Sequence, residues 1–195
     1  MSSSALDAWF GIRKDRLDEL LSMHAKATGT GPGRRYGTTE FNRTLVTALV
    51  AQFQGFARDL HDLAVTEFVR TLEPPTRADK VRQLLTQGRK LDERTPRRST
   101  LGSDFGRLGI ELIDAVKGHH ADSADRLHTL DQVVELRNAV GHGNEAEIAR
   151  LVQEGYKTTK TAFRKYRRTF NGLAETMDEV VAIQLSSILG MPRPW

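Results

Sequence analysis

The spacing of the apolar residues between positions 38 and 72 constrains the fold more than any other feature of this sequence. Apolar side chains recur there every three or four residues, at Phe41, Leu45, Leu49, Phe53, Phe56, Leu60, Leu63 and Phe68. This period matches the turn of an α-helix and not the alternation of a β-strand. The same spacing continues along the chain, and β-branched runs bounded by turn residues are missing. We therefore expect an all-α protein that folds as an antiparallel helical bundle.

Capping and breaking residues divide the chain into its expected helices. Glycine, proline and N-capping side chains place them at about residues 4–28, 38–72, 76–91, 103–118, 123–140, 144–154 and 159–189. The first of these helices is expected to turn one face to the core, with Leu6, Phe10, Leu17, Leu20 and Leu21. The expected domain organisation is a single domain over residues 1–195, with an N-terminal helix and glycine-rich loop (1–37), a bundle core (38–189) and a frayed tail (190–195).

The composition excludes several classes of protein. Cysteine is absent from the 195 residues, which excludes disulfide frameworks, thiolate nucleophiles and zinc sites built from cysteine. The N-terminal segment is charged throughout, and nowhere do eighteen apolar residues follow one another. We therefore expect a cytoplasmic protein with no signal peptide and no membrane-spanning segment.

The positive charge of the chain is concentrated in one segment. Lysine and arginine outnumber aspartate and glutamate by 29 to 25, a modest excess that favours polyanionic partners. Residues 155–174 hold no acid and six cations: Lys157, Lys160, Arg164, Lys165, Arg167 and Arg168. Three aromatic residues lie between these cations, at Phe163, Tyr166 and Phe170.

Two interpretations of this basic segment remain open. In the first, the cations contact RNA phosphates and the three rings stack on bases, with the candidate residues being Arg164, Lys165, Arg167 and Arg168. In the second, the cations form a solvated helix face, and the rings, which recur at helical spacing, belong to the core. The two interpretations do not exclude each other.

A second candidate site lies in the stretch ELRNAVGHGNE, residues 135–145. On an unbroken helix Arg137 and His142 are rotated by about 140° from one another, so the two side chains do not share a site. Gly141 and Gly143 allow the helix to break and His142 to turn towards the arginine. Otherwise the stretch is an ordinary helix end, with a C-terminal glycine and a histidine that fills the turn.

Arg137, Asn138 and His142 have the properties that metal-independent cleavage of RNA requires. The 2′-hydroxyl of the ribose supplies the nucleophile, so the protein only has to transfer protons and neutralise charge. A histidine titrates near neutral pH, and an arginine stays cationic and binds phosphate through its planar guanidinium. In this hypothesis Asn138 orients the imidazole or a phosphate oxygen.

The six residues Arg137 to His142 resemble the R-x4-H motif of the HEPN superfamily, including the polar residue after its arginine. The segment ALVAQFQGFARDLHDL, residues 48–63, is similar to the early long helix of HEPN ribonucleases from prokaryotic toxin and defence loci. Gln54 stands where those families favour an acid, which puts any role of that acid in doubt. The resemblance extends by architecture over about residues 38–189.

The resemblance implies a specific activity. HEPN proteins of this type are homodimers that bring two motifs together and cut RNA without metal or cofactor, leaving 2′,3′-cyclic phosphate and 5′-hydroxyl ends. The resemblance therefore implies a toxin or antiphage endoribonuclease that acts on single-stranded or looped RNA, with an antitoxin or another regulatory protein as a possible partner. Some HEPN toxins are silenced by modification of a tyrosine after the histidine, but Gly143 and Asn144 occupy that place here.

Two alternatives stay open beside this hypothesis. The chain is a catalytically inactive HEPN-like module for RNA binding or dimerisation, or it is a structural helical adaptor with neither activity. The segment GTGPGRRYG, residues 29–37, lacks the lysine and hydroxyl of a phosphate-binding P-loop and is interpreted as a surface loop. His119, His120 and His128 are interpreted as surface residues and not as metal ligands.

Overall fold

The computed structural model describes residues 1–28, 38–72 and 74–195, whose regular structure is helical, so the all-α prediction is confirmed. Along the chain the helices are α1 (Ser4–Ala8), η1 (Trp9–Arg13), α2 (Lys14–Thr28), α3 (Thr39–Arg70), α4 (Pro75–Thr86), α5 (Lys90–Glu93), α6 (Arg98–Gly106), α7 (Leu112–His119), α8 (Ser123–Gly141), α9 (Glu145–Gln153) and α10 (Lys160–Leu189). The loop expected over residues 29–37 lies outside the described residues.

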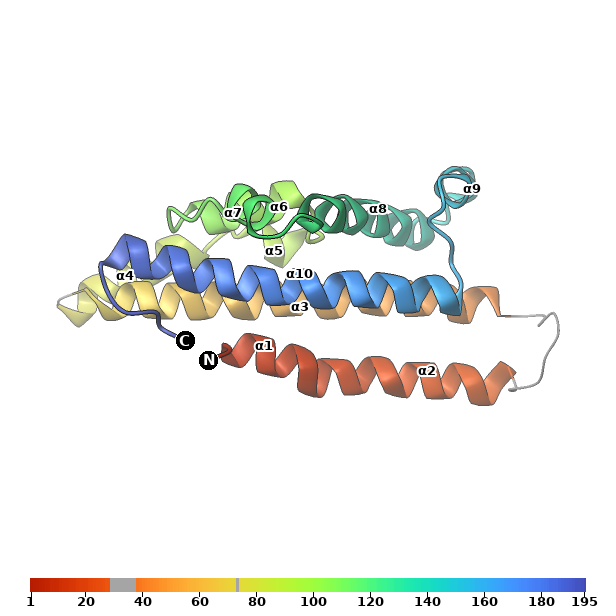
Figure 1. Cartoon of the computed structure of the whole chain (residues 1–195), viewed down its shortest axis with the longest axis horizontal. Helices are drawn as coiled ribbons and strands as arrows, with labels where there is room; N and C mark the ends of the chain where they lie inside the picture. The colour runs from red at the N-terminus through yellow and green to blue at the C-terminus, as the bar shows by residue number, and fades with distance from the viewer. Residues whose placement is uncertain (29–37, 73) are drawn as a thin grey trace.

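Helices α3, α8 and α10 pack against one another and enclose the core. Consecutive long helices alternate in direction, so α3 and α10 run parallel and α8 runs antiparallel to both (Figure 1). The rings of Phe53 on α3 and Phe170 on α10 meet at 4.9 Å between centroids, and both side chains are fully buried. Most of the apolar stripe predicted for residues 38–72 therefore forms the centre of the bundle, but Phe41 at its start is exposed, and Leu63 and Phe68 are only partly buried.

The N-terminal segment, residues 4–28, packs against α3 as one interrupted helix. Gly11 has non-helical dihedral angles, and η1 around it is a wider, π-helical turn. This turn shifts which side chains face inward: Trp9 is buried, whereas Phe10 is partly exposed. The prediction that Phe10 faces the core is therefore wrong, because it assumed an uninterrupted helical period.

The segment between residues 98 and 119 contains two helices instead of the one predicted for 103–118. Helix α6 begins at Arg98, so Ser103 lies inside it and is not its cap. The chain then turns through Gly109, whose φ of +77° is accessible to glycine, before α7 starts at Leu112. The helix predicted for residues 76–91 is likewise divided, into α4 and α5.

The C-terminal tail docks on the bundle, which contradicts the prediction of a frayed tail. Trp195 is partly buried, and its indole nitrogen donates a hydrogen bond to the carbonyl oxygen of Asp178 on α10. The carboxyl group of the same aspartate accepts from the backbone nitrogen of Ser3 at 3.2 Å. Both ends of the described chain thus meet at one turn of α10 (Figure 1). Burial of the Asp178 side chain raises the pKa of its carboxyl group.

Candidate functional site

Helix α8 continues to Gly141, and His142 is its C-terminal cap. The backbone N–H of His142 still donates to the carbonyl oxygen of Asn138, as in a regular helix. The left-handed residue is Gly143, with φ of +62°, and the N–H groups of Gly143 and Asn144 close a Schellman motif on Val140 and Ala139. The expected break between Arg137 and His142 is therefore wrong, since the helix runs to Gly141 and the left-handed turn comes only after His142.

Arg137 and His142 consequently project from an unbroken helix at about 140° to each other. Arg137 is half-buried and lies within about 40° of the fully buried Leu130 and Val133, on the side of α8 that faces the bundle. His142 is exposed, and its ring forms no hydrogen bond or ion pair with another described residue. Within one chain the two groups do not converge on a single phosphate.

Asn138 contacts the arginine of this motif. Its side-chain oxygen accepts a hydrogen bond from Nη1 of Arg137 at 3.1 Å, and both side chains are half-buried. The amide therefore restrains the direction of the guanidinium. Of the two roles considered for Asn138, orienting the imidazole receives no support from this geometry.

The three aromatic rings of the basic segment belong to the core. Phe163 and Phe170 are fully buried, and Tyr166 is nearly so, with its hydroxyl donating to the carbonyl oxygen of Lys157 at 3.1 Å. Burial raises the pKa of Tyr166 to about 12. The interpretation that these rings stack on bases is wrong, because the helical period places all three between α10 and its neighbours.

The four cations proposed for RNA binding are not equivalent. Arg164, Lys165 and Arg168 are exposed on α10, and none has an acidic partner within ion-pair distance among the described residues. Arg167 instead forms an ion pair with Asp18 of α2 and is largely buried. The hydrogen bond from Arg167 lowers the pKa of the Asp18 carboxyl group. The charge of Arg167 is thus used in an ion pair that links α10 to α2.

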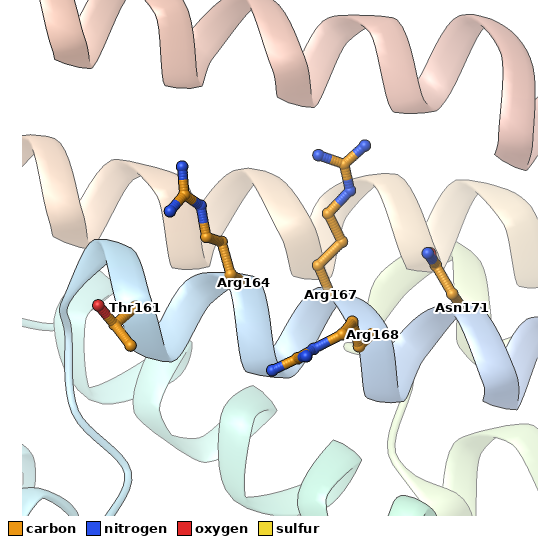
Figure 2. A pocket seen from close by; sticks show the side chains of 5 residues that line it. All are labelled: Thr161, Arg164, Arg167, Arg168 and Asn171. Carbon is orange, nitrogen blue, oxygen red and sulfur yellow. The ribbon is translucent and has the colours of Figure 1, made fainter.

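Arg164, Arg167 and Arg168 line a hollow of about 440 Å³ together with Thr161 and Asn171, all on α10. Figure 2 shows Arg164 and Arg167 extending on the same side of α10, while Arg168 lies along the helix. Thr161 and Asn171 were not among the candidates, although positions 161, 164, 168 and 171 recur at helical spacing. The three- and four-residue spacing of these polar side chains is the sequence signal that would have identified Thr161 and Asn171.

Two other sequence hypotheses concern residues that pack within the fold. The amide of Gln54 donates to the carbonyl oxygens of Leu91 and Arg94, at 2.7 and 3.0 Å, so it holds the chain around α5 against α3.

The rings of His119 and His120 pack edge to face at 4.5 Å between centroids. Within the described ranges, no three histidine, aspartate or glutamate side chains come together as a metal site would require.

Comparison of the chain with protein-family models, curated proteins and solved structures finds no match. The resemblance to the HEPN superfamily therefore depends on the residues quoted for it. Within the part of the chain that the structure describes, no helix is long and apolar enough to cross a lipid bilayer.

Proposed function

We propose that this protein binds RNA through the exposed cations of the N-terminal half of α10. The observation that carries the proposal is a row of three cations at helical spacing, Lys160, Arg164 and Arg168, which form no ion pair with described acidic residues. Such cations bind phosphates and release counterions, whereas cations already in ion pairs gain less. Because the aromatic rings of α10 are buried, the contacts are with the RNA backbone and not with base faces.

The test is RNA binding as a function of salt concentration. Fluorescence anisotropy of a labelled RNA 20-mer is measured for the wild type and for the triple variant Lys160→Gln, Arg164→Gln, Arg168→Gln. A control of equal charge change carries Arg77→Gln, Lys80→Gln and Lys90→Gln, at exposed positions in and near α4 and α5. Helix α4 lies at the opposite end of the bundle from the start of α10, and α5 lies near the middle (Figure 1).

We expect the affinity of the wild type to fall steeply with salt, and the α10 variant to lose most of its affinity and of its salt dependence. Each phosphate contact contributes about 0.7 to the slope of log K against log salt concentration for a single strand. The control variant is expected to change both quantities little. Equal losses in the two variants exclude a specific surface on α10 and leave only attraction by net charge.

The second candidate function is metal-independent endoribonuclease activity of the HEPN type. It is supported by the R-x4-H resemblance, by the exposed imidazole of His142, which has no partner among the described residues, and by the restrained guanidinium of Arg137. Since these two groups diverge within a chain, the site is composite: a homodimer places the Arg137 of one copy near the His142 of the other. His142 transfers the proton, and Arg137 stabilises the charge of the pentacoordinate phosphorane.

This second proposal extends to the biology that the resemblance implies. The protein is then a cytoplasmic toxin or antiphage effector with an HEPN-like bundle, restrained by an antitoxin or another regulatory protein. The test is incubation of RNA in EDTA with the wild type and with Arg137→Ala and His142→Ala. Cleavage by the wild type alone, giving 2′,3′-cyclic phosphate ends, supports the activity. Equal cleavage by all three proteins, or none by any of them, leaves RNA binding as the function.

A further inference from the structure

The exposed surface of α10 has two sides that differ in charge. Thr161, Arg164 and Asn171 follow one another at helical spacing on the side that faces α2 and α3. Lys165 and Thr169 follow on the side that faces α8. Arg168 lies between the two sides and lines hollows on both.

The side towards α2 and α3 forms one continuous groove. A hollow of about 500 Å³ lies between the start of α10 and the facing residues of α2 and α3, lined by Asn42, Lys160 and Thr161 among others. It shares Thr161 and Arg164 with the 440 Å³ hollow along α10, so the two are contiguous. No acidic side chain is among the described residues that line either hollow.

The side towards α8 is different. Its hollow of about 430 Å³ is lined by Asp122 and Asp125 as well as by Lys165 and Arg126. Arg126 is already bound to Asp122, through Nε at 3.0 Å and Nη2 at 2.7 Å. A phosphate placed here approaches two carboxylates, and like charges at such distances repel one another. The charge lining this side is therefore mixed, whereas the described residues that line the groove carry no acid, and the neighbouring Asp18 is already paired with Arg167.

We infer that the RNA backbone lies in the groove between α10 and the α2–α3 side, along Lys160, Arg164 and Arg168, and does not cross to the α8 side. This inference rests on the proposed RNA binding and specifies the path of the strand. Lys160 and Arg164 contact phosphates; Thr161 and Asn42 supply neutral hydrogen-bonding groups to the backbone beside them. Lys165 is excluded from the path although it is exposed and adjacent in sequence to Arg164.

Two lysines on the same helix give a matched test of this path. Lys160→Gln and Lys165→Gln make the same chemical change five residues apart, on opposite sides of the inferred boundary. We expect Lys160→Gln to weaken binding of the RNA 20-mer about tenfold, and to lower the salt slope by about 0.7. Lys165→Gln is expected to change the affinity less than about twofold, because its phosphate contact is not made.

Chemical protection of the unmodified protein provides a measurement that does not depend on the variants. Free and RNA-bound wild type are treated with an amine-acetylating reagent, and the rates at Lys160 and Lys165 are measured by mass spectrometry. RNA is expected to slow acetylation of Lys160 severalfold and to leave Lys165 unchanged. Protection of both lysines, or of Lys165 alone, overturns the inferred path while RNA binding stands. Failure of the wild type to bind RNA at all removes the proposed function and the path together.

Discussion

Arg89 donates a hydrogen bond from Nη1 to Nδ1 of His61 at 3.2 Å, inside the bundle between α3 and α5. Arginine has no acceptor, so Nδ1 carries no proton. The other ring nitrogen, Nε2, then bears the hydrogen and donates to the carbonyl oxygen of Asp104 at 3.1 Å. The fully buried imidazole is therefore neutral, with its tautomer determined by two partners.

This neutral ring makes the stability of the protein depend on pH. Burial is the main cause that lowers the pKa of His61, and the neighbouring Arg89 charge adds to it. Because the unfolded chain binds the proton more readily, the contribution is fully present above the unfolded pKa of about 6.5 and is lost as pH falls through the folded pKa. Urea unfolding between pH 7.5 and 5 is expected to show this loss.

The control for the pH prediction is His61→Phe, which keeps a ring against Phe105 and cannot titrate. This variant is expected to be less stable than the wild type at neutral pH and to depend less on pH between 7.5 and 5. An identical pH dependence in the two proteins shows that other groups produce it.

Within this cluster, substitution of Arg89 is expected to lower the stability of the protein the most. Its guanidinium is nearly buried and also binds Asp62 and Asp92, at 2.6 and 2.9 Å. Arg89→Met keeps the length of the side chain and leaves Nδ1 of His61 and both carboxylates without this donor. We expect a loss of about 2 kcal/mol in the free energy of unfolding, below the full cost of a broken buried pair because the two acids are partly exposed.

Gly55 on α3 leaves the space that the guanidinium of Arg13 occupies. A Cβ atom on Gly55 would lie 2.7 Å from Cζ of Arg13, whose guanidinium binds Gln52 and Asp59. Gly55→Ala is therefore expected to displace Arg13 and to destabilise the protein by about 1 kcal/mol. Faster hydrogen exchange in α1 and η1 is expected to accompany this loss.

The same substitution is expected to change sign when Arg13 is removed. In the Arg13→Ala background no guanidinium competes for the space, and alanine favours the helix over glycine by about 0.5–1 kcal/mol. A double-mutant cycle of urea unfolding measures this coupling between the two positions. If Gly55→Ala has the same effect in both backgrounds, the arginine is not what requires the glycine.

The divergence of Arg137 and His142 leads to a prediction about mixed dimers. If each catalytic site takes the arginine from one copy and the histidine from the other, Arg137→Ala and His142→Ala homodimers are inactive, yet a mixed dimer has one intact site. Random exchange of equal amounts makes about half of the dimers mixed, so about a quarter of the wild-type RNA cleavage is expected to return. A mixture that stays inactive after subunit exchange contradicts a site shared in this way.

The helical character of the chain could be predicted because it is a local property. Apolar residues at three- and four-residue spacing bury one face wherever the helix packs, so the range expected for residues 38–72 agrees closely with α3, and that for 159–189 with α10. Asn144 and Thr159 act as N-caps, accepting from the backbone N–H groups of Glu147 and Ala162, as their side chains favour. The same local rules fail at Gly11 and Gly109, where a glycine permits both a helix and an interruption.

The geometry of the candidate sites could not be predicted from local sequence patterns, because it depends on the turn after α8 and on contacts between helices distant in the chain. The motif at residues 137–142 was visible in the sequence, but whether the chain turned before or after His142 was decided by the Schellman motif at Gly143. The six cations of residues 155–174 were equally visible. Only the packing of α2 and α8 beside α10 showed that Arg167 is neutralised by Asp18 and that Lys165 faces carboxylates.

The sequence by itself determined which segments are helical and which faces of them are apolar, because backbone hydrogen bonds and hydrophobic periodicity act over a few residues. The tertiary structure alone decided which charged groups stay free, because the charge near each cation comes from helices distant in the chain. The electrostatic interaction of two groups depends on their separation and on their burial, and both are properties of the packed bundle.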